Sequence, residues 1–212
     1  MSSHTLSRFS EVNMSVNFKK NQEVSLNELG GSSPILVFGI SWDNKTKDGI
    51  ISKITGEKYD ADLDLSCVMY DNNNDRIDCI WYAQLRSKCG SIRHKGDETI
   101  GEKEVDDETV SIDLNNLNEN AKTLIFVISS FAGDTFDHVD GAYWHLFDGQ
   151  TKREIGRYVF SPKDKSSAKI VMRLQKTETE GLSEWRIKAL DEEATGHNVQ
   201  EIFPEIRSLI EA

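Results

Sequence analysis

The stretch DLDLSCVMYDNNNDRIDCIWYA, residues 62–83, contains two strand-like patterns on either side of a polar turn. Apolar and polar side chains alternate at its start, and β-branched and aromatic residues recur in both halves. The residues DNNND at 71–75 separate the two patterns, as in a β-hairpin. The stretch therefore predicts an antiparallel pair of strands.

Similar patterns recur along most of the chain between turn signals. The predicted strands are 34–41, 62–70, 77–83, 109–114, 123–131, 142–148, 153–160, 168–176 and 184–190. Nine or ten short strands joined by polar turns indicate a mainly β fold, an antiparallel β-sandwich. In the turn at 147–154 we expect Gly149 to supply a positive φ.

Only the C-terminal end has a helical period. In residues 197–210 an apolar face recurs at three- and four-residue steps and consists of Val199, Ile202, Phe203, Ile206, Leu209 and Ile210. We expect Pro204 to kink or divide this short helix. Residues 1–13 are predicted to be a disordered leader, and 14–212 a single β-sandwich domain, because a regular pattern begins at Met14.

The composition limits the function. With 36 acidic and 25 basic residues among 212, the net charge is -11, so binding to nucleic acid is not expected and cations or basic surfaces are favoured as partners. Cys67, Cys79 and Cys89 match neither a CxxC pair nor zinc-ligand spacing and are interpreted as reduced thiols. No apolar run is long enough for a transmembrane segment or a signal peptide, which predicts a cytoplasmic protein.

Carboxylates gather in two places. Asp60, Asp62 and Asp64 alternate with apolar residues, so they should share one face of a strand whose other face enters the core. The second cluster, GDETIGEKEVDDE at 96–108, has seven carboxylates and one lysine in thirteen positions, with glycines that let the backbone turn its carbonyls inward. Such hard oxygen donors without interleaved histidine or thiolate are the ligands of Ca²⁺, and Mg²⁺ ranks second.

This predicted calcium site is not an EF-hand. When DADLDL is aligned with that loop, Leu65 occupies the glycine position and Asp71 the position of the bidentate glutamate. A site built from these residues would join a strand to a distant loop. The alternative, that both clusters are solvated segments that keep an acidic protein soluble, remains open.

Dispersed motifs resemble those of a known family. WDN (42–44), DLDLS (62–66), IDCIWY (77–82), GDETIGEKEVDDE (96–108) and REIGRYVFS (153–161) occur in the order seen in the tellurium-resistance TerD family. SKCGSIRHKGD (87–97) and ISSFAGDTFDHVDGAYWHLFD (128–148) are most similar to its TerZ branch. The resemblance covers nearly everything from Met14 onward. It implies a calcium-binding β-sandwich from bacterial stress operons linked to resistance to tellurite, colicins and phage.

The resemblance also implies metal ligands and one or two calcium ions. Matched position by position, the ligands are Asp62, Asp64, Asp97, Glu102, Asp106, Asp107 and Glu108, with Glu104, Asp43, Asp60 and the carbonyl of Ile100 as further candidates. The family pattern GDNxTGEGxGDDE is changed here by Glu98, Ile100, Lys103 and Val105. Lys103 adds a positive charge, and Lys103 and Val105 replace glycines, which puts one of the calcium sites in doubt.

Three functions compete. The first is a calcium-binding, non-enzymatic stress-response protein, and the second is an acidic scaffold that docks other Ter-family or membrane-associated proteins with only structural metal. The third, an enzyme acting on an oxyanion, lacks a redox pair and is not favoured. Asp137 and Asp140 flank His138, but no nucleophile or oxyanion hole accompanies them, so no catalytic residue is predicted.

Overall fold

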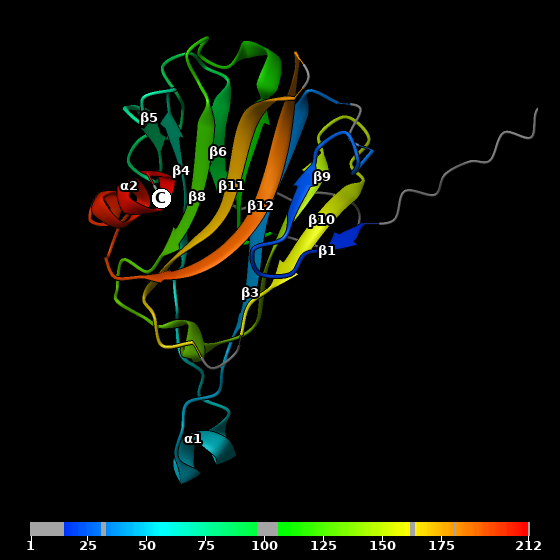
Figure 1. Cartoon of the computed structure of the whole chain (residues 1–212). Helices are drawn as coiled ribbons and strands as arrows, with labels where there is room; N and C mark the ends of the chain where they lie inside the picture. Colours follow the sequence, from blue (N-terminus) through cyan, green and yellow to red (C-terminus); the bar gives the residue numbers. More distant parts are fainter. Residues whose placement is uncertain (1–14, 31–32, 97–105, 162–163, 180, 212) are drawn as a thin grey trace, which may run out of the picture.

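The computed structural model describes residues 15–30, 33–96, 106–161, 164–179 and 181–211. In these residues twelve strands form two six-stranded sheets (Figure 1). Sheet A has the order β1 (Val16–Asn17), β10 (Glu154–Val159), β9 (Val139–Asp148), β3 (Ile35–Asn44), β7 (Glu108–Asp113), β6 (Ile92–Gly96). Sheet B has the order β2 (Glu23–Ser25), β12 (Leu182–Ala194), β11 (Ala168–Thr179), β8 (Thr123–Ser129), β4 (Asp64–Tyr70), β5 (Arg76–Ile80).

The predicted β-sandwich is therefore confirmed, and each of the nine predicted strands is present. The hairpin β4–β5 turns at residues 71–75, as expected. One pair departs from the antiparallel rule, because β1 runs parallel to β10. These two strands are more than a hundred residues apart, so no tight turn forces them to be antiparallel. The predicted leader, residues 1–13, lies outside the described part of the chain.

The core between the sheets is aromatic at its centre. Phe38 of β3 lies 4.6 Å from Phe126 of β8 and 5.4 Å from Trp144 of β9, measured between ring centroids. All three are fully buried. Alternate residues of β3 and β8 thus supply facing layers of the sandwich, which is why a period of two in the sequence predicted the fold.

The outer face of sheet B is buried as well. The C-terminal segment, which ends in α2 (Phe203–Glu211), places Val199, Ile202 and Ile206 against it. Every residue of β8 is consequently buried, and the sequence TLIFVIS is continuously apolar instead of alternating. The helix is shorter than predicted: it begins at Phe203, and Pro204 occupies its first turn, where a missing N–H costs nothing, instead of kinking it.

The turn between β9 and β10 corrects another expectation. The residue with positive φ is Lys152, at 59°, and not Gly149. Gly149 is needed for space, because a Cβ at this position would lie 2.5 Å from Cγ2 of Ile35. Its N–H donates to the carbonyl of Ile35 at 2.8 Å, which holds the two segments this close.

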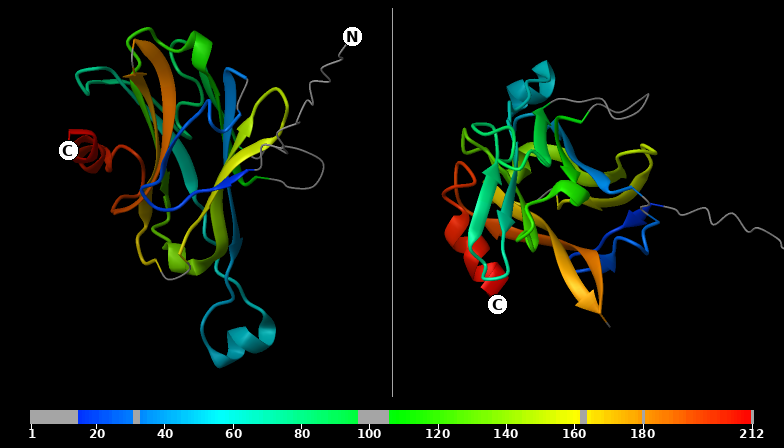
Figure 2. Two further views of the ribbon diagram at one scale, coloured as in Figure 1. Left: turned by 45° about the vertical axis from the view of Figure 1, so that its right-hand side comes forward. Right: turned by 90° about the horizontal axis from the view of Figure 1, so that it is seen from above.

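A projecting segment between β3 and β4 was not predicted. Residues 45–59, here called the finger, form a short ladder in which Thr46 pairs with Lys58, and they carry α1 (Ile50–Thr55) at the tip. Glycines bound this helix, with Gly56 in the left-handed region at φ 72°. Figure 1 and the left view of Figure 2 show α1 beyond the end of the sandwich. Six helical residues are too few to give a sequence period.

A buried lysine links the C-terminal strands to a loop. Lys169 of β11 is almost fully buried, and its Nζ contacts Asp164 and lies 2.5 Å from Oδ1 of Asp191 in β12. The Tyr158 hydroxyl donates to the other Asp191 oxygen at 2.6 Å. Burial opposes the charge on Lys169, but the two carboxylates outweigh it and raise the pKa of the ammonium group. One buried cation therefore pairs with two acids, Asp191 in sheet B and Asp164 in the loop before β11.

The cysteines are free thiols, as predicted. Burial raises the pKa of Cys67, and it raises the pKa of Cys79 to about 12. Partial burial opposes ionisation of the exposed Cys89, but hydrogen bonds with Ser87 and Ser91 outweigh it and lower the pKa of Cys89.

We expect iodoacetamide to alkylate Cys89 first in the native protein, because the thiolate is the reacting species. Cys67 and Cys79 should react at comparable rates only in denaturant. Peptide mass spectrometry after timed quenching measures all three rates, and rapid native-state labelling of Cys67 would contradict this order.

No helix within the described ranges is both long enough and apolar enough to cross a bilayer.

Candidate functional site

The aspartate cluster lies where the chain enters sheet B. Leu63 and Leu65 are buried in the core, whereas Asp60 and Asp62 are exposed and Asp64 is partly buried, so the predicted alternation is confirmed. The strand itself begins only at Asp64, and the residues before it lead from the finger. Asp62 and Asp64 therefore present their carboxylates at one end of the sandwich.

Glu108 brings the second acidic segment to the first. It begins β7 in sheet A, and its Oε2 accepts a hydrogen bond from the backbone N–H of Leu65 in sheet B. The same oxygen lies 3.4 Å from Nε2 of His94. The strand acid and the loop acid, 44 positions apart in the chain, thus meet across the two sheets.

The neighbouring acids change the protonation of Asp64. Burial, then the charges of Glu108 and Asp62, raise the pKa of Asp64 to about 6, although His94 and a backbone hydrogen bond at Phe131 work in the opposite direction. The carboxylates therefore repel one another in the protein alone. A cation placed among them would relieve this repulsion.

A shallow cavity of about 220 Å³ opens beside these acids. Its lining consists of Asp62, Asp64, Tyr82 and Phe131. The two aromatic rings lie 6.0 Å apart in an edge contact, and both are largely exposed. Tyr82 and Phe131 lie in the last two positions of the predicted strands 77–83 and 123–131, and nothing in the sequence connected them to the aspartates.

His94 lies behind the cluster, and its acidic neighbours favour its protonated form. Burial opposes its protonation, but Glu108, the carbonyl of Leu65 and Asp64 outweigh it and raise the pKa of His94. Its Nε2 lies 3.0 Å from that carbonyl oxygen. His94 thus pairs with Glu108 of the acidic segment.

Asp106 is directed elsewhere. It is buried and contacts Nε2 of His145, whose Nδ1 lies 3.5 Å from Oε2 of Glu154. Gly39 makes room for this pair, because a Cβ there would lie 2.5 Å from Oδ2 of Asp106. That oxygen has no hydrogen-bond partner within the described part of the chain. The chain bends at Asp107, so Asp106 and Glu108 lie on opposite faces of sheet A.

Asp107 and Asp43 lie near Trp42. Oδ2 of Asp107 accepts from the Trp42 N–H at 2.9 Å, and the Trp42 indole donates to the carbonyl of Ala61 at 3.1 Å. Trp42 thereby holds the two acidic segments together. Asp43 is exposed and pairs in register with Asp140 of β9.

The remaining predicted ligands, Asp97, Ile100, Glu102 and Glu104, lie outside the described residues. Within the described ranges no group of three or more His, Cys, Asp or Glu side chains is arranged to hold a metal. Asp62, Asp64 and Glu108 are thus a partial set, and only Asp106 and Asp107 separate the segment 97–105 from Glu108 in the chain.

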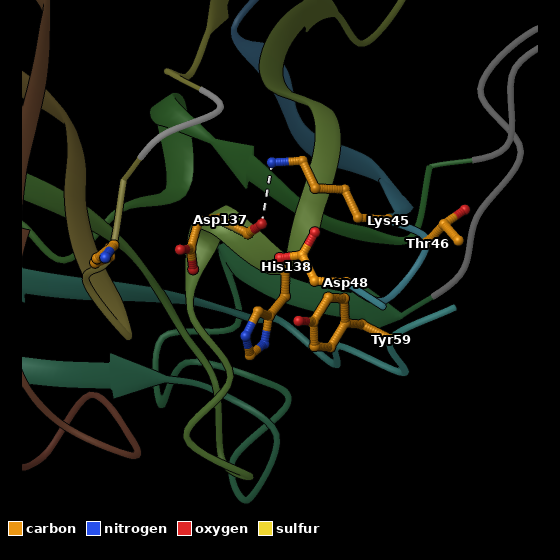
Figure 3. A pocket seen from close by; sticks show the side chains of 7 residues that line it. Lys45, Thr46, Asp48, Tyr59, Asp137 and His138 are labelled. Carbon is orange, nitrogen blue, oxygen red and sulfur yellow. Dashed lines mark hydrogen bonds between the residues drawn. The ribbon is translucent and has the colours of Figure 1, made fainter. Parts of the chain in front are cut away.

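A larger cavity, of about 540 Å³, lies at the base of the finger (Figure 3). It is lined by Lys45, Thr46, Asp48, Tyr59, Asp137, His138 and Lys165. Figure 3 shows the rings of Tyr59 and His138 stacked, with centroids 3.9 Å apart, and Lys45 donating to the Asp137 carbonyl at 3.0 Å. Two lysines and two aspartates line the cavity, so it favours neither an anionic nor a cationic ligand. The stacked rings and the Lys45 hydrogen bond anchor the finger to the body.

Comparison with known proteins gives consistent matches. The TerD domain model matches residues 14–203. The tellurium resistance protein TerZ of Serratia marcescens is 31% identical over 92% of this chain and 98% of its own length. Stress response protein SCP2 of Bacillus subtilis is 25% identical over 90% of this chain and 98% of its own.

A solved structure shares the fold. The crystal structure of a homologue of telluride resistance protein TerD from Streptomyces coelicolor A3(2) superposes with a TM-score of 0.59. It is 16% identical and covers 78% of this chain and 93% of its own. At this identity the likeness concerns the sandwich alone.

Proposed function

Since the chain belongs to the TerD domain family, whose matched relatives are named for tellurium resistance and stress response, we propose that it is a cytoplasmic, calcium-binding, non-enzymatic stress-response protein. Those names state no catalytic activity. Calcium would be held by acids from both sheets, and its role here is to change the stability and surface charge of the sandwich.

The convergence of Asp62, Asp64 and Glu108 carries this proposal. Acids on a merely solvated surface spread apart, whereas here the burial of Asp64 and its acidic neighbours raise its pKa to about 6. A bound divalent cation would offset this repulsion between the carboxylates, which would explain why the fold brings them together. The donors are all oxygen atoms, which fits Ca²⁺ better than Zn²⁺.

The remaining ligands would come from the segment between β6 and β7. Asp97, Glu102, Glu104 and the carbonyl of Ile100 would add to the described acids and bring the count toward the six to eight oxygens that Ca²⁺ prefers. Asp107, the neighbour of Glu108 in the chain, would extend the set. Asp106 is the weakest candidate for a calcium ligand, because its carboxylate contacts His145 on the other face of sheet A.

Calorimetric titration of chelator-treated protein tests the proposal. We expect saturable binding of one or two calcium ions, much weaker binding of magnesium, and a higher melting temperature with calcium, because a ligand of the folded state alone stabilises it. Titration heats equal to those of dilution, together with an unchanged melting curve, would reject calcium binding.

A further inference from the structure

The tip of the finger exposes an apolar face that no other segment in the described ranges covers. Ile50, Ile51 and Ile54 of α1 are 81%, 75% and 80% exposed. At 100° per residue, positions i, i+1 and i+4 fall within about a 100° arc, so the three side chains form one face. No residue of α1 is buried. Helical segments this short normally depend on packing of the apolar face, and this face packs on nothing within the described ranges.

The finger also differs in charge from the rest of the chain. Residues 45–59 contain four lysines against Asp48 and Glu57, a net charge of +2 on a chain of net charge -11. Lys47 pairs with Glu57 at 2.6 Å, whereas Lys53, within α1, and Lys58, two residues after its C-cap Gly56, are exposed. An apolar tip flanked by lysines is complementary to the surface of a membrane, in which an apolar layer lies beneath anionic headgroups.

The shape of the finger points to the same kind of partner. α1 stands beyond the ends of the strands in Figure 1 and in the left view of Figure 2, so it reaches a flat surface before the body does. A protein interface of standard size needs about 20–30 residues a side, far more than a helix of six residues can offer. A second copy of this chain would therefore be held poorly by the tip.

The base of the finger is held rigidly enough to carry such a tip. The Tyr59 N–H donates to the Lys45 carbonyl at 2.8 Å, and the Lys45 N–H donates to the His138 carbonyl at 2.9 Å. The stacked rings of Tyr59 and His138 add a second connection to the body. The exposed Phe131 lies at the same end of the sandwich, because it follows β8 where Ser129 pairs with Asp64.

We propose that the finger inserts Ile50, Ile51 and Ile54 into the surface of a lipid bilayer that contains anionic lipids, with Lys53 and Lys58 at the headgroups. The proposal does not depend on calcium binding. The acids Asp60, Asp62 and Asp64 lie on the body side of the finger and repel anionic lipid, so calcium would strengthen the attachment without creating it.

Sedimentation with vesicles tests the insertion. The full chain is mixed with phosphatidylglycerol–phosphatidylcholine vesicles or with phosphatidylcholine alone, in chelator and in calcium. We expect preferential binding to the anionic vesicles and at least tenfold weaker binding when Ile51→Asp and Ile54→Asp are combined. Leu182→Asp is the matched control, because Leu182 is 75% exposed at the opposite end of the sandwich, and it should bind as the unmodified chain does.

A fluorescence experiment tests the depth of the tip. Ile51→Trp should shift its emission to the blue on anionic vesicles, whereas Leu182→Trp should not. Melting curves should be unchanged in the aspartate variants, since the replaced side chains are exposed. Equal vesicle binding by the double variant, or no binding by the unmodified chain in either condition, overturns the proposal. Self-association that the double variant abolishes, without vesicle binding, assigns the tip to a second copy and also overturns it.

Discussion

Replacing Asp64 with asparagine is expected to stabilise the metal-free protein and to remove most of the stabilisation that calcium provides. The pKa of Asp64 is raised to about 6 in the folded state. Between about pH 4 and pH 6 the folded protein therefore keeps a proton that the unfolded chain has released, and stability falls as pH rises through this window. At neutral pH the full cost of the ionised carboxylate is present.

The size of both effects can be bounded. A pKa raised from 3.8 to about 6 corresponds to about 3 kcal/mol, and solvent screening of this half-buried group reduces the cost to about 1–2 kcal/mol. Asp64→Asn should recover this amount in chelator. Calcium at a hundredfold excess over its Kd stabilises the unmodified protein by about 2.7 kcal/mol, and the variant should lose most of this gain.

Urea unfolding in chelator and in calcium measures both effects, and repetition at about pH 4 checks the linkage, because protonation removes the cost in the unmodified chain. Asp75→Asn is the control, since Asp75 is exposed in the turn at the other end of β4. An undiminished calcium effect in Asp64→Asn would exclude Asp64 as a ligand. A loss of stability in chelator would refute the repulsion argument.

Replacing Lys169 with methionine is expected to destabilise the protein by about 3–5 kcal/mol. The side chain has a similar length and apolar stem, so packing changes little. The loss comes from Asp164 and Asp191, which would be left close together without the cation that both contact. Urea unfolding at neutral pH measures the change.

The pH dependence separates this cause from a packing defect. Burial raises the pKa of Asp164, but hydrogen bonds from Lys169 and Ser166 outweigh it, so the net pKa is lowered. Its contribution is present at neutral pH and lost in acid. The deficit of Lys169→Met should therefore shrink at about pH 4, where protonation relieves the two acids. Lys176→Met, on the exposed part of β11, should cost little, and a deficit independent of pH would indicate a packing defect instead.

The sequence predicted the sandwich well because its main signal is local. The alternation at residues 60–65 and the continuous apolar runs in β3 and β8 follow directly from which strand faces are buried. The missed strands lack that signal: β1 and β2 have two and three residues, and β6 reads IRHKG. His94 in β6 is buried only because Glu108 and the Leu65 carbonyl meet it there, and these partners are distant in the chain.

The candidate site was predictable in part for the same reason. Period two placed Asp62 and Asp64 on one face, and the acidic loop included Glu108. The separation of Asp106 from Glu108 was not predictable, because it depends on a bend at Asp107 and on the space that Gly39 leaves for His145. The finger likewise carries no periodic pattern, since its helix spans fewer than two turns.

The cover that α2 and its preceding turn place over sheet B has a consequence during synthesis. Val199, Ile202 and Ile206 follow all twelve described strands in the chain and so are translated after them, yet they shield Ile125, Val127 and Ile170. A nascent chain can assemble the strands of the sandwich first and still present a bare apolar sheet to the ribosome surface and to chaperones. The outer face of sheet B is therefore covered only after its strands have been made, and chains that stop before residue 199 are the copies most exposed to aggregation and proteolysis.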